Sequence, residues 1–256
     1  MKTLSFVIPV YNEENRLEKT LEALGQGFDY SGITLKEIIF VNDGSTDKTG
    51  SILKDECKRL EKATDAKVKI ISYQPNQGKG KAIRTGMLAS IADYTLFFDA
   101  DMATPLTEFK KFMPYIKKNK PVIVGTRKNG ESTVVKHQPF YRESMGKVFT
   151  LLSNIILNTW VTDFTCGFKA FEYKAKEEIF GKSQVNGWGY DAEILFLAKK
   201  LGYEITEKAV LWSDDSRTRV NLIKDSFRSF KELIQIRLNN FNLSPIKNLA
   251  WATPKH

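Results

Sequence analysis

Cysteine, histidine and long apolar runs are all scarce in this sequence. Two cysteines among 256 residues, Cys57 and Cys166, are too few for a disulfide framework, which favours a reducing compartment. His137 has no Cys or His partner at metal-ligand spacing, so we assign it to a loop. The longest uncharged run, residues 148–162, is shorter than the roughly 18–20 apolar residues that cross a bilayer. We therefore expect no transmembrane span.

Internal repeats, low-complexity tracts and Pro/Gly-rich linkers are also absent. The simplest organisation is one domain, residues 1–220, followed by a C-terminal extension, residues 221–256. The apolar residues 4–10 lack a small-residue cleavage motif, so they predict a first buried strand rather than a secretion signal. Together with the few cysteines, this indicates a cytoplasmic protein.

Positive charge is in surplus. Lys and Arg total 39 against 30 Asp and Glu, which gives a formal net charge of +9. This surplus favours anionic partners such as nucleic acid, nucleotide phosphates or an anionic membrane surface. The sequence contains no recognised nucleic-acid module, and its basic residues are spread rather than paired with an aromatic platform. We therefore expect no nucleic-acid partner.

Short apolar runs alternate with helical patterns in the first half of the chain. Strands are predicted at residues 4–10, 37–41, 68–71 and 94–98, and helices at 16–25, 47–60 and 80–91. This alternation indicates right-handed βαβ units, and hence an α/β fold with a mostly parallel, Rossmann-like sheet flanked by helices. Ligands of such sheets bind beyond the carboxyl ends of the strands. That rule selects residues 11–14, 42–45, 74–81 and 99–102.

The second half is less regular. It contains a fifth predicted strand at 122–125, a polar loop from 127 to 141, and helices at 142–160, 190–201 and 221–240. The aromatic pair Phe97 and Phe98 is expected in the core. Trp188 and Trp212 are candidates for stacking on a sugar or a prenyl chain, although core packing is the more common fate of buried aromatic residues.

Two carboxylates one residue apart, Asp99 and Asp101, follow the fourth predicted strand. Hard oxygen ligands at the end of a sheet suit Mg²⁺ or Mn²⁺ bridged to a diphosphate. An Asp-x-Asp pair can also cap a helix, but Thr104 and Pro105 already supply the cap and first turn of the next one. The pair therefore predicts a metal site.

The loops after the second and third strands provide further polar groups. Asp43 can accept hydrogen bonds from a base or ribose, and the alternative is a plain turn in which Ser45 or Thr46 caps the following helix. Residues 76–82 are similar to a phosphate-binding loop. They lack the Walker A spacing, which argues against a P-loop NTPase.

Together these motifs resemble the family 2 inverting glycosyltransferases, which have the GT-A fold. The resemblance rests on residues 7–14, 41–47, 76–80 and 99–101, each at the end of a predicted strand. Residues 124–127, Arg142, 163–171 and 187–193 are similar to the polyprenyl-phosphate sugar synthases. Within that group the dolichyl-phosphate β-glucosyltransferases match best, and the mannose synthases are near relatives.

The resemblance implies transfer of a hexose from a nucleotide diphosphate sugar to a polyprenyl phosphate, with inversion. Glucose from UDP-glucose is preferred, and GDP-mannose is the alternative. A lipid phosphate needs no general base because it is already anionic at neutral pH. A sugar hydroxyl as acceptor would need one, and Asp191 lies where hydroxyl-directed relatives carry it.

The resemblance also assigns site residues. Nucleoside binding is implied for Pro9, Tyr11, Glu13 and Asp43. Lys79 is placed beside the donor, and Asp99, Ala100 and Asp101 are placed at the metal and diphosphate. The acceptor phosphate is assigned to Arg127 and Arg142, and a loop over the donor to residues 216–220 with Arg217 and Arg219. The catalytic set is Asp99, Asp101, Arg127, Arg142 and Asp191.

A polyprenyl acceptor requires work at a bilayer. Residues 147–160 are largely apolar and end in Trp160, and residues 222–238 alternate apolar and basic side chains at helical spacing. Both segments are candidates for lying in the membrane interface, and packing against the domain is the alternative. We expect a peripheral protein at the cytoplasmic face of a membrane, with a basic amphipathic C-terminal helix.

Overall fold

A computed structural model describes residues 1–27, 30, 32–128, 134–136, 140–213 and 222–240. At 134–136, 140–143 and 222–227 it describes the backbone alone. The predicted site residues Arg217 and Arg219, as well as His137, lie outside the described residues.

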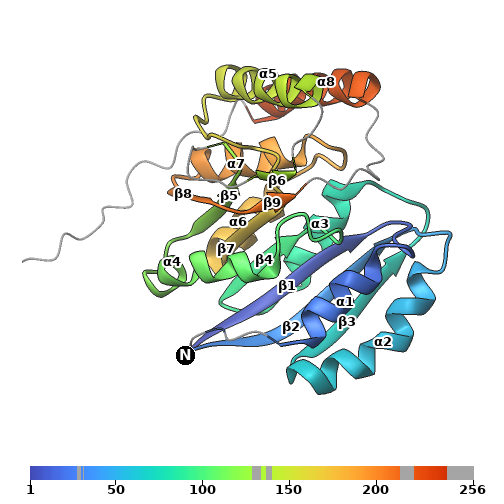
Figure 1. The fold of residues 1–256 in the computed structure, drawn as a ribbon. Coiled ribbons are helices and arrows are strands. Elements are labelled where there is room, and N and C mark those ends of the chain that lie inside the picture. The colour runs from blue at the N-terminus through green and yellow to red at the C-terminus, as the bar shows by residue number, and fades with distance from the viewer. Residues whose placement is uncertain (28–29, 31, 129–133, 137–139, 214–221, 241–256) are drawn as a thin grey trace, which may run out of the picture.

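One seven-stranded sheet, in the order β3-β2-β1-β4-β7-β5-β8, forms the centre of the molecule (Figure 1). Its strands are β1 (Lys2–Val10), β2 (Ile33–Asp43), β3 (Lys67–Tyr73), β4 (Tyr94–Phe98), β5 (Val122–Thr126), β7 (Phe168–Glu172) and β8 (Ile205–Ala209). Only β7 runs antiparallel to its neighbours β4 and β5 among the described pairings; the other paired strands are parallel. The predicted α/β fold with a mostly parallel sheet is confirmed.

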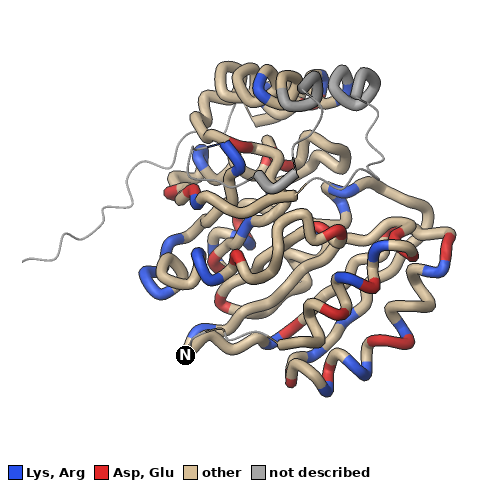
Figure 2. Tube along the Cα trace, viewed as in Figure 1, with Lys and Arg blue, Asp and Glu red and all other residues tan. Residues whose placement is uncertain are grey.

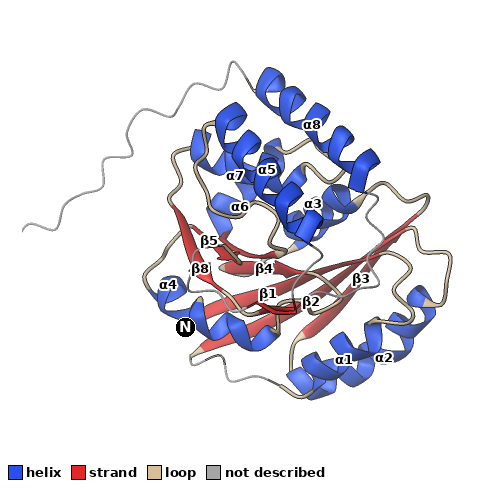
Figure 3. Ribbon diagram, turned by 45° about the horizontal axis from the view of Figure 1, so that its top comes forward, coloured by secondary structure: helices blue, strands red, loops and turns tan. Residues whose placement is uncertain are grey.

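Helices cover both faces of this sheet (Figure 3). One face carries α1 (Leu17–Gly25), α2 (Thr49–Thr64), the 3-10 helix η1 (Leu106–Lys111) and α4 (Met113–Lys117). The other face carries α3 (Lys79–Ala89), α6 (Tyr173–Lys182) and α7 (Tyr190–Lys200).

Burial on both faces explains why β1 is an apolar run rather than an alternating strand. Phe6 and Ile8 pack into the core beneath α1 and α2, and Val7 packs into the core on the α3 face. Helix α3 approaches β1 closely, since a Cβ built on Gly86 would lie 2.4 Å from Val7 Cγ1. Phe97 and Phe98 of β4 are likewise buried, one on each face, as predicted.

An outer layer of two helices lies beyond α7. Helices α5 (Phe140–Leu157) and α8 (Leu222–Asn239) pack side by side (Figure 1). Leu157 of α5 and Leu233 and Ile236 of α8 are buried in the core of the α3 face. No helix in the described part of the chain is both long enough and apolar enough to span a membrane.

A small second sheet pairs β6 (Val134–Lys136) with β9 (Trp212–Ser213). Strand β6 lies within the segment 127–141 that was predicted as a polar loop, and α5 begins at Phe140, two residues before the predicted start. Ser213 N–H donates to the carbonyl of Ala103 at 2.9 Å. This contact places β9 beside the loop that carries Asp99 and Asp101.

Candidate active site

The carboxyl ends of β2, β1 and β4 lie next to one another, because these strands are neighbours in the sheet. The loop after β1 is fastened to the loop after β2. Asn12 N–H donates to Ser45 Oγ at 2.9 Å, and Glu13 N–H donates to Thr49 Oγ1 at 2.7 Å. Glu13 Oε2 accepts from Arg16 Nε at 2.6 Å. The predicted nucleoside residues of the first loop thus border the second.

Two more of the predicted nucleoside residues belong to the same edge. Pro9 pairs with Val41 in the ladder between β1 and β2 and is buried. Tyr11, directly after β1, is 40% exposed. The exposed Tyr11 ring is accessible for stacking on a base, whereas the contact predicted for the buried Pro9 stays a prediction.

Asp43 is fully engaged by the loop after β3. Its carboxylate accepts from Gln77 N–H at 2.8 Å, Gly78 N–H at 2.9 Å and Asn76 Nδ2 at 2.7 Å. Gly44 has a φ of +72°, and a Cβ there would lie 2.4 Å from Asn76 N, so the two loops touch through backbone. Asp43 therefore fixes the turn that precedes Lys79. Its predicted contact with a nucleoside stays a prediction.

Lys79 and Asp99 form the centre of the site. Lys79 Nζ lies 2.7 Å from Asp99 Oδ1, and it also lies over the rings of Trp188 at 5.6 Å and Tyr190 at 5.9 Å. Burial alone would lower the pKa of Lys79, but the carboxylates of Asp99 and Asp191 raise it above its ordinary value. Lys79 is therefore a permanent cation beside Asp99.

The residues after β4 fit a divalent cation. Asp101 lies two residues from Asp99. Its pKa is raised, mainly by burial and also by the negative charge of Asp99. Ala103 N–H donates to Asp101 Oδ1 at 3.0 Å, and the Ala100 carbonyl accepts from Thr20 Oγ1 at 2.5 Å, which fixes the loop. Two crowded carboxylates are a hard-oxygen donor set that Mg²⁺ or Mn²⁺ would neutralise. Among the described residues no group of three or more His, Cys, Asp or Glu could hold a metal, so any ion here needs further ligands.

Arg127, at the end of β5, is clamped by Asp163. Its Nε and Nη2 lie 2.7 and 2.9 Å from the two carboxylate oxygens, Nη2 also donates to Thr165 Oγ1 at 2.7 Å, and the Trp212 ring lies 5.1 Å from its Cζ. Burial opposes ionisation of Asp163, but the Arg127 guanidinium holds its pKa well below the ordinary range. Asp163 had no predicted role of its own. The adjacent Phe164 and the nearby Val161 are the available signal in the sequence that this carboxylate is buried.

Lys128 is a second cation that the sequence reasoning missed. Its Nζ lies 3.8 Å from Asp163 Oδ1 and donates to Thr150 Oγ1 at 2.8 Å and to the Gly146 carbonyl at 3.1 Å. Burial lowers its pKa. These bonds tie β5 to α5, the helix whose backbone carries Arg142 one turn before Gly146.

Asp191 forms a buried ion pair with Lys169. Lys169 is fully buried in β7 and also donates to the carbonyls of Phe164 at 2.9 Å and Cys166 at 2.7 Å. Burial raises the pKa of Asp191, and Lys169 opposes that rise. Sequence reasoning found Asp191 but missed its partner, because a lysine is rarely fully buried.

Of the two alternatives that the sequence left open for Trp188, core packing is excluded, and stacking on a ligand stays a prediction. The Trp188 side chain is 39% exposed rather than buried in the core, because it lies on the loop before α7 and covers Lys79. Trp212 is half-buried against Arg127. Both aromatic rings thus lie against cations of the site.

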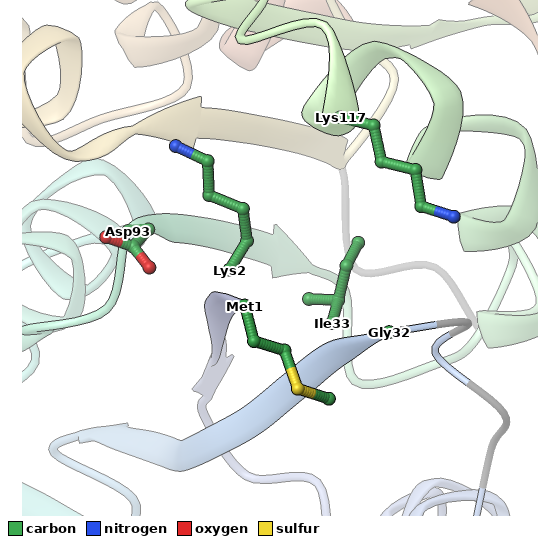
Figure 4. A pocket seen from close by; sticks show the side chains of 6 residues that line it. All are labelled: Met1, Lys2, Gly32, Ile33, Asp93 and Lys117. Carbon is green, nitrogen blue, oxygen red and sulfur yellow. The ribbon is translucent and has the colours of Figure 1, made fainter.

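A surface cavity of about 480 Å³ lies at the opposite end of the sheet (Figure 4). It is lined by Met1, Lys2, Gly32, Ile33, Asp93 and Lys117. These residues include the amino ends of β1 and β2 and the residue before β4. The cavity is therefore separate from the cluster of Lys79, Asp99 and Asp101.

The fold is GT-A, the class found in solved glycosyltransferase structures. Glucosyl-3-phosphoglycerate synthase from Mycobacterium tuberculosis, solved with Mn²⁺, UDP and glucosyl-3-phosphoglycerate, matches with a TM-score of 0.64 at 19% identity, covering 93% of this chain and 79% of that one. A 1–349 fragment of TarS from S. aureus matches with a TM-score of 0.55 at 18% identity, covering 94% and 74%. At these identities the likeness concerns the fold.

The family model Glycosyl transferase family 2 matches residues 5–180, and the chain belongs to this family. Dolichyl-phosphate beta-glucosyltransferase of Dictyostelium discoideum is 31% identical, over 91% of this chain and 73% of the relative. The enzyme of the same name in Saccharomyces cerevisiae is 32% identical over 92% and 74%. The one in Homo sapiens is 30% identical over 93% and 75%. The chain is therefore a glycosyltransferase.

Proposed function

We propose that this glycosyltransferase transfers glucose from UDP-glucose to a polyprenyl phosphate of the dolichyl type, with inversion. One observation carries the proposal: a single loop joins two phosphate-adapted groups. Asp163 of this loop clamps Arg127, and Gly167 of the same loop packs on Asp99, where a Cβ would lie 2.2 Å from Oδ2. Donor diphosphate and acceptor phosphate would then meet across residues 163–167.

The donor side is supported by Lys79, Asp99 and Asp101. A divalent cation held by the two aspartates would supply charge neutralisation of the departing diphosphate. Lys79, already paired with Asp99, adds a fixed positive charge at the same place. Such preorganised charges stabilise the leaving group without reorganising during the reaction. UDP-glucose is preferred because the relatives are named for glucosyl transfer, and GDP-mannose is the alternative donor.

The acceptor side is assigned to Arg127, with Arg142 and Lys128 nearby in the chain and the fold. The Asp163 clamp leaves the guanidinium plane in one orientation, which suits recognition of a phosphate. An oxygen of the lipid phosphate would bond to the anomeric carbon as the bond from that carbon to the diphosphate breaks. The nucleophile is already anionic, so the reaction reduces to alignment and charge neutralisation.

Asp191 separates this proposal from transfer to a sugar hydroxyl. Its carboxylate is paired with Lys169, which suits an orienting group better than a proton acceptor. We expect Asp191→Asn to lower kcat by less than about 100-fold, with donor binding retained, because general-base catalysis contributes roughly 10²–10⁴-fold. Steady-state kinetics and donor calorimetry measure this. A larger loss of kcat in a folded variant with intact donor binding would support the hydroxyl acceptor.

An exposed apolar surface on α5 and α8 supports the proposed lipid acceptor. Exposed apolar side chains follow one stripe on each helix: Val148, Leu151 and Ile155 on α5, and Phe230, Ile234 and Leu238 on α8. Arg228, Lys231 and Arg237 are exposed on α8, where Figure 2 marks basic residues on the outer layer. Apolar stripes flanked by cations are typical of interfacial helices. We propose that this layer, to which the extension contributes α8, docks the protein at the cytoplasmic face of a membrane.

A panel of nucleotide sugars, assayed with a short polyprenyl phosphate with and without Mn²⁺, tests the proposal. We expect transfer from UDP-glucose that exceeds transfer from GDP-mannose and is lost in excess chelator. Greater transfer from GDP-mannose would establish the alternative donor. Full activity in chelator would overturn the metal role of Asp99 and Asp101.

A further inference from the structure

Glu232 of α8 reaches from the outer layer into the loop before α7. Its Oε2 accepts from Gly189 N–H at 2.7 Å. The Glu232 side chain is only 13% exposed, although α8 lies at the surface. Its neighbour Leu233, and Ile236 one turn further on, are buried and anchor this part of the helix. The buried residues next to Glu232 therefore fix the position of its carboxylate.

Two glycines make room for this carboxylate. A Cβ built on Gly187 would lie 2.3 Å from Glu232 Oε1, and one built on Gly189 would lie 2.7 Å from Oε2 and 2.9 Å from the Glu232 Cβ. Real Cβ atoms do not approach so closely, so the backbone of this loop packs directly against the Glu232 side chain. The contact is thus steric as well as polar.

Trp188 lies between the two glycines, and its ring lies against Lys79, which pairs with Asp99. Lys79 Nζ lies 5.6 Å from the Trp188 ring and 2.7 Å from Asp99 Oδ1. A chain of direct contacts therefore runs from Glu232 through residues 187–189 to Lys79 and Asp99. Arg228, one turn earlier on α8, lies 3.4 Å from Glu232 Oε1 and is largely exposed.

We propose that Glu232 is a positioning residue, through which α8 holds residues 187–189 so that Trp188 stays against Lys79 at the donor site. Glu232 touches neither donor nor acceptor; it acts through the loop. The inference rests on the proposed function, because it takes Lys79 to be a donor-binding group. Helix α8 would then have two roles: its outward face contacts the membrane, and Glu232 supports the donor site.

A purely structural role predicts a different outcome from a positioning role. A carboxylate at the start of α7 also stabilises that helix through its N-terminal N–H groups. Loss of that effect would lower the unfolding temperature and leave donor affinity unchanged. Loss of positioning would weaken donor binding and leave kcat and the KM for the acceptor nearly unchanged.

Glu232→Ala tests this directly in the full chain. We expect the KM for UDP-glucose to rise about tenfold, as befits loss of a hydrogen bond to a charged group, with kcat and acceptor KM within about twofold. Glu232→Gln keeps an oxygen acceptor and should fall between wild type and Glu232→Ala. Gln235→Ala, an exposed change on the same helix, should match wild type. Hydrogen exchange at residues 187–190 should quicken in Glu232→Ala while the rest of α7 stays protected.

Gly187→Ala provides a matched double-mutant cycle, since the three heavy atoms nearest to its new Cβ all belong to the Glu232 carboxylate group. We expect Gly187→Ala to raise the donor KM by displacing that carboxylate, and to add nothing in the Glu232→Ala background. Additive effects, or a Glu232→Ala chain with wild-type donor KM, would overturn the role of Glu232. A wild-type chain that binds no nucleotide sugar would overturn the proposed function, and the role of Glu232 with it.

Discussion

The buried pair of Asp163 and Arg127 is the most demanding arrangement at the scale of single residues. Asp163 is fully buried, and its carboxylate is satisfied by the Arg127 guanidinium, the Arg127 N–H and the backbone of Thr165. An isolated buried carboxylate would cost several kcal/mol, so both partners must be present for either to be tolerated. The same pair orients the guanidinium that we assign to the acceptor phosphate.

Asp163→Asn should therefore destabilise the protein. We expect a loss of about 3 kcal/mol in the free energy of unfolding at pH 7, because Arg127 loses its charged partner in a buried place. Chemical denaturation of wild type and variant measures this. Glu56→Gln, which removes a surface ion pair with Arg59, is a suitable control and should change stability by less than about 1 kcal/mol.

The same variant has a defined pH dependence. The pKa of Asp163 in the folded protein lies below its ordinary value of 3.8, because Arg127 and Lys128 outweigh the effect of burial. Its contribution to stability is therefore fully present above about pH 4 and is lost as the pH falls through the folded pKa. The difference between wild type and Asp163→Asn should narrow below about pH 4. A difference that stays constant from pH 7 to pH 3 would contradict this account.

Some site residues could be predicted from the sequence and others could not, and the difference depends on whether their role is visible locally or only through a partner far away in the chain. Asp99, Asp101 and Lys79 were found because they lie in the segments 99–102 and 74–81, which follow apolar strands that the sequence pattern marks. Asp163 and Lys169 were not, because a single sequence does not show which charges are buried together. Arg127 and Asp163 are 36 residues apart, and only the fold brings them within 2.7 Å.

At the scale of elements, the first four strands were predictable because each contains a short apolar run bounded by polar segments; β1, β2 and β4 are largely buried, whereas the edge strand β3 buries only Val68. The antiparallel direction of β7 was not predictable, since it depends on the path of the chain from α5 rather than on the residues of the strand. That direction has a consequence for the site. It places the start of β7, and with it residues 163–167, at the same edge as Asp99, which directly follows β4.

Gly167→Ala tests this placement. A Cβ there would lie 2.2 Å from Asp99 Oδ2, so the Asp99 carboxylate or the loop that carries residue 167 must shift, which disturbs the position of this carboxylate. We expect the affinity for Mn²⁺ with UDP to fall at least tenfold while the protein remains folded, measured by calorimetry and circular dichroism. Gly181→Ala in α6 is the control, because nothing lies within 4 Å of its Cβ, and it should bind as wild type. Unchanged binding in Gly167→Ala would contradict the assigned site.

At the scale of the whole molecule, the polar site at the strand ends is separate from the outer layer of α5 and α8, which exposes apolar side chains. In the outer layer Ile155 is 60% exposed and Leu238 is 67% exposed, whereas the core residues beneath this layer are buried. The sequence predicted both apolar segments. It did not predict that the two helices pack side by side, because their pairing is a tertiary contact between distant segments.

Ile155→Glu combined with Ile234→Glu tests the membrane role of this layer. Acidic side chains on both stripes should abolish flotation with anionic liposomes at low salt, because they remove apolar area and repel the surface. Donor binding in solution should stay within twofold of wild type. Ile91→Glu, on an exposed apolar residue away from the layer, is the control and should float normally. A double variant that still floats would overturn membrane docking by α5 and α8.

The identity and anomeric configuration of the product test the central claim most directly. The chain is incubated with UDP-glucose, Mn²⁺ and a short polyprenyl phosphate, and the product is examined by mass spectrometry and NMR. Our account predicts one glucose on the lipid phosphate, with the configuration opposite to that of the donor. A product with retained configuration, or glucose attached to a hydroxyl acceptor in place of the phosphate, would contradict it.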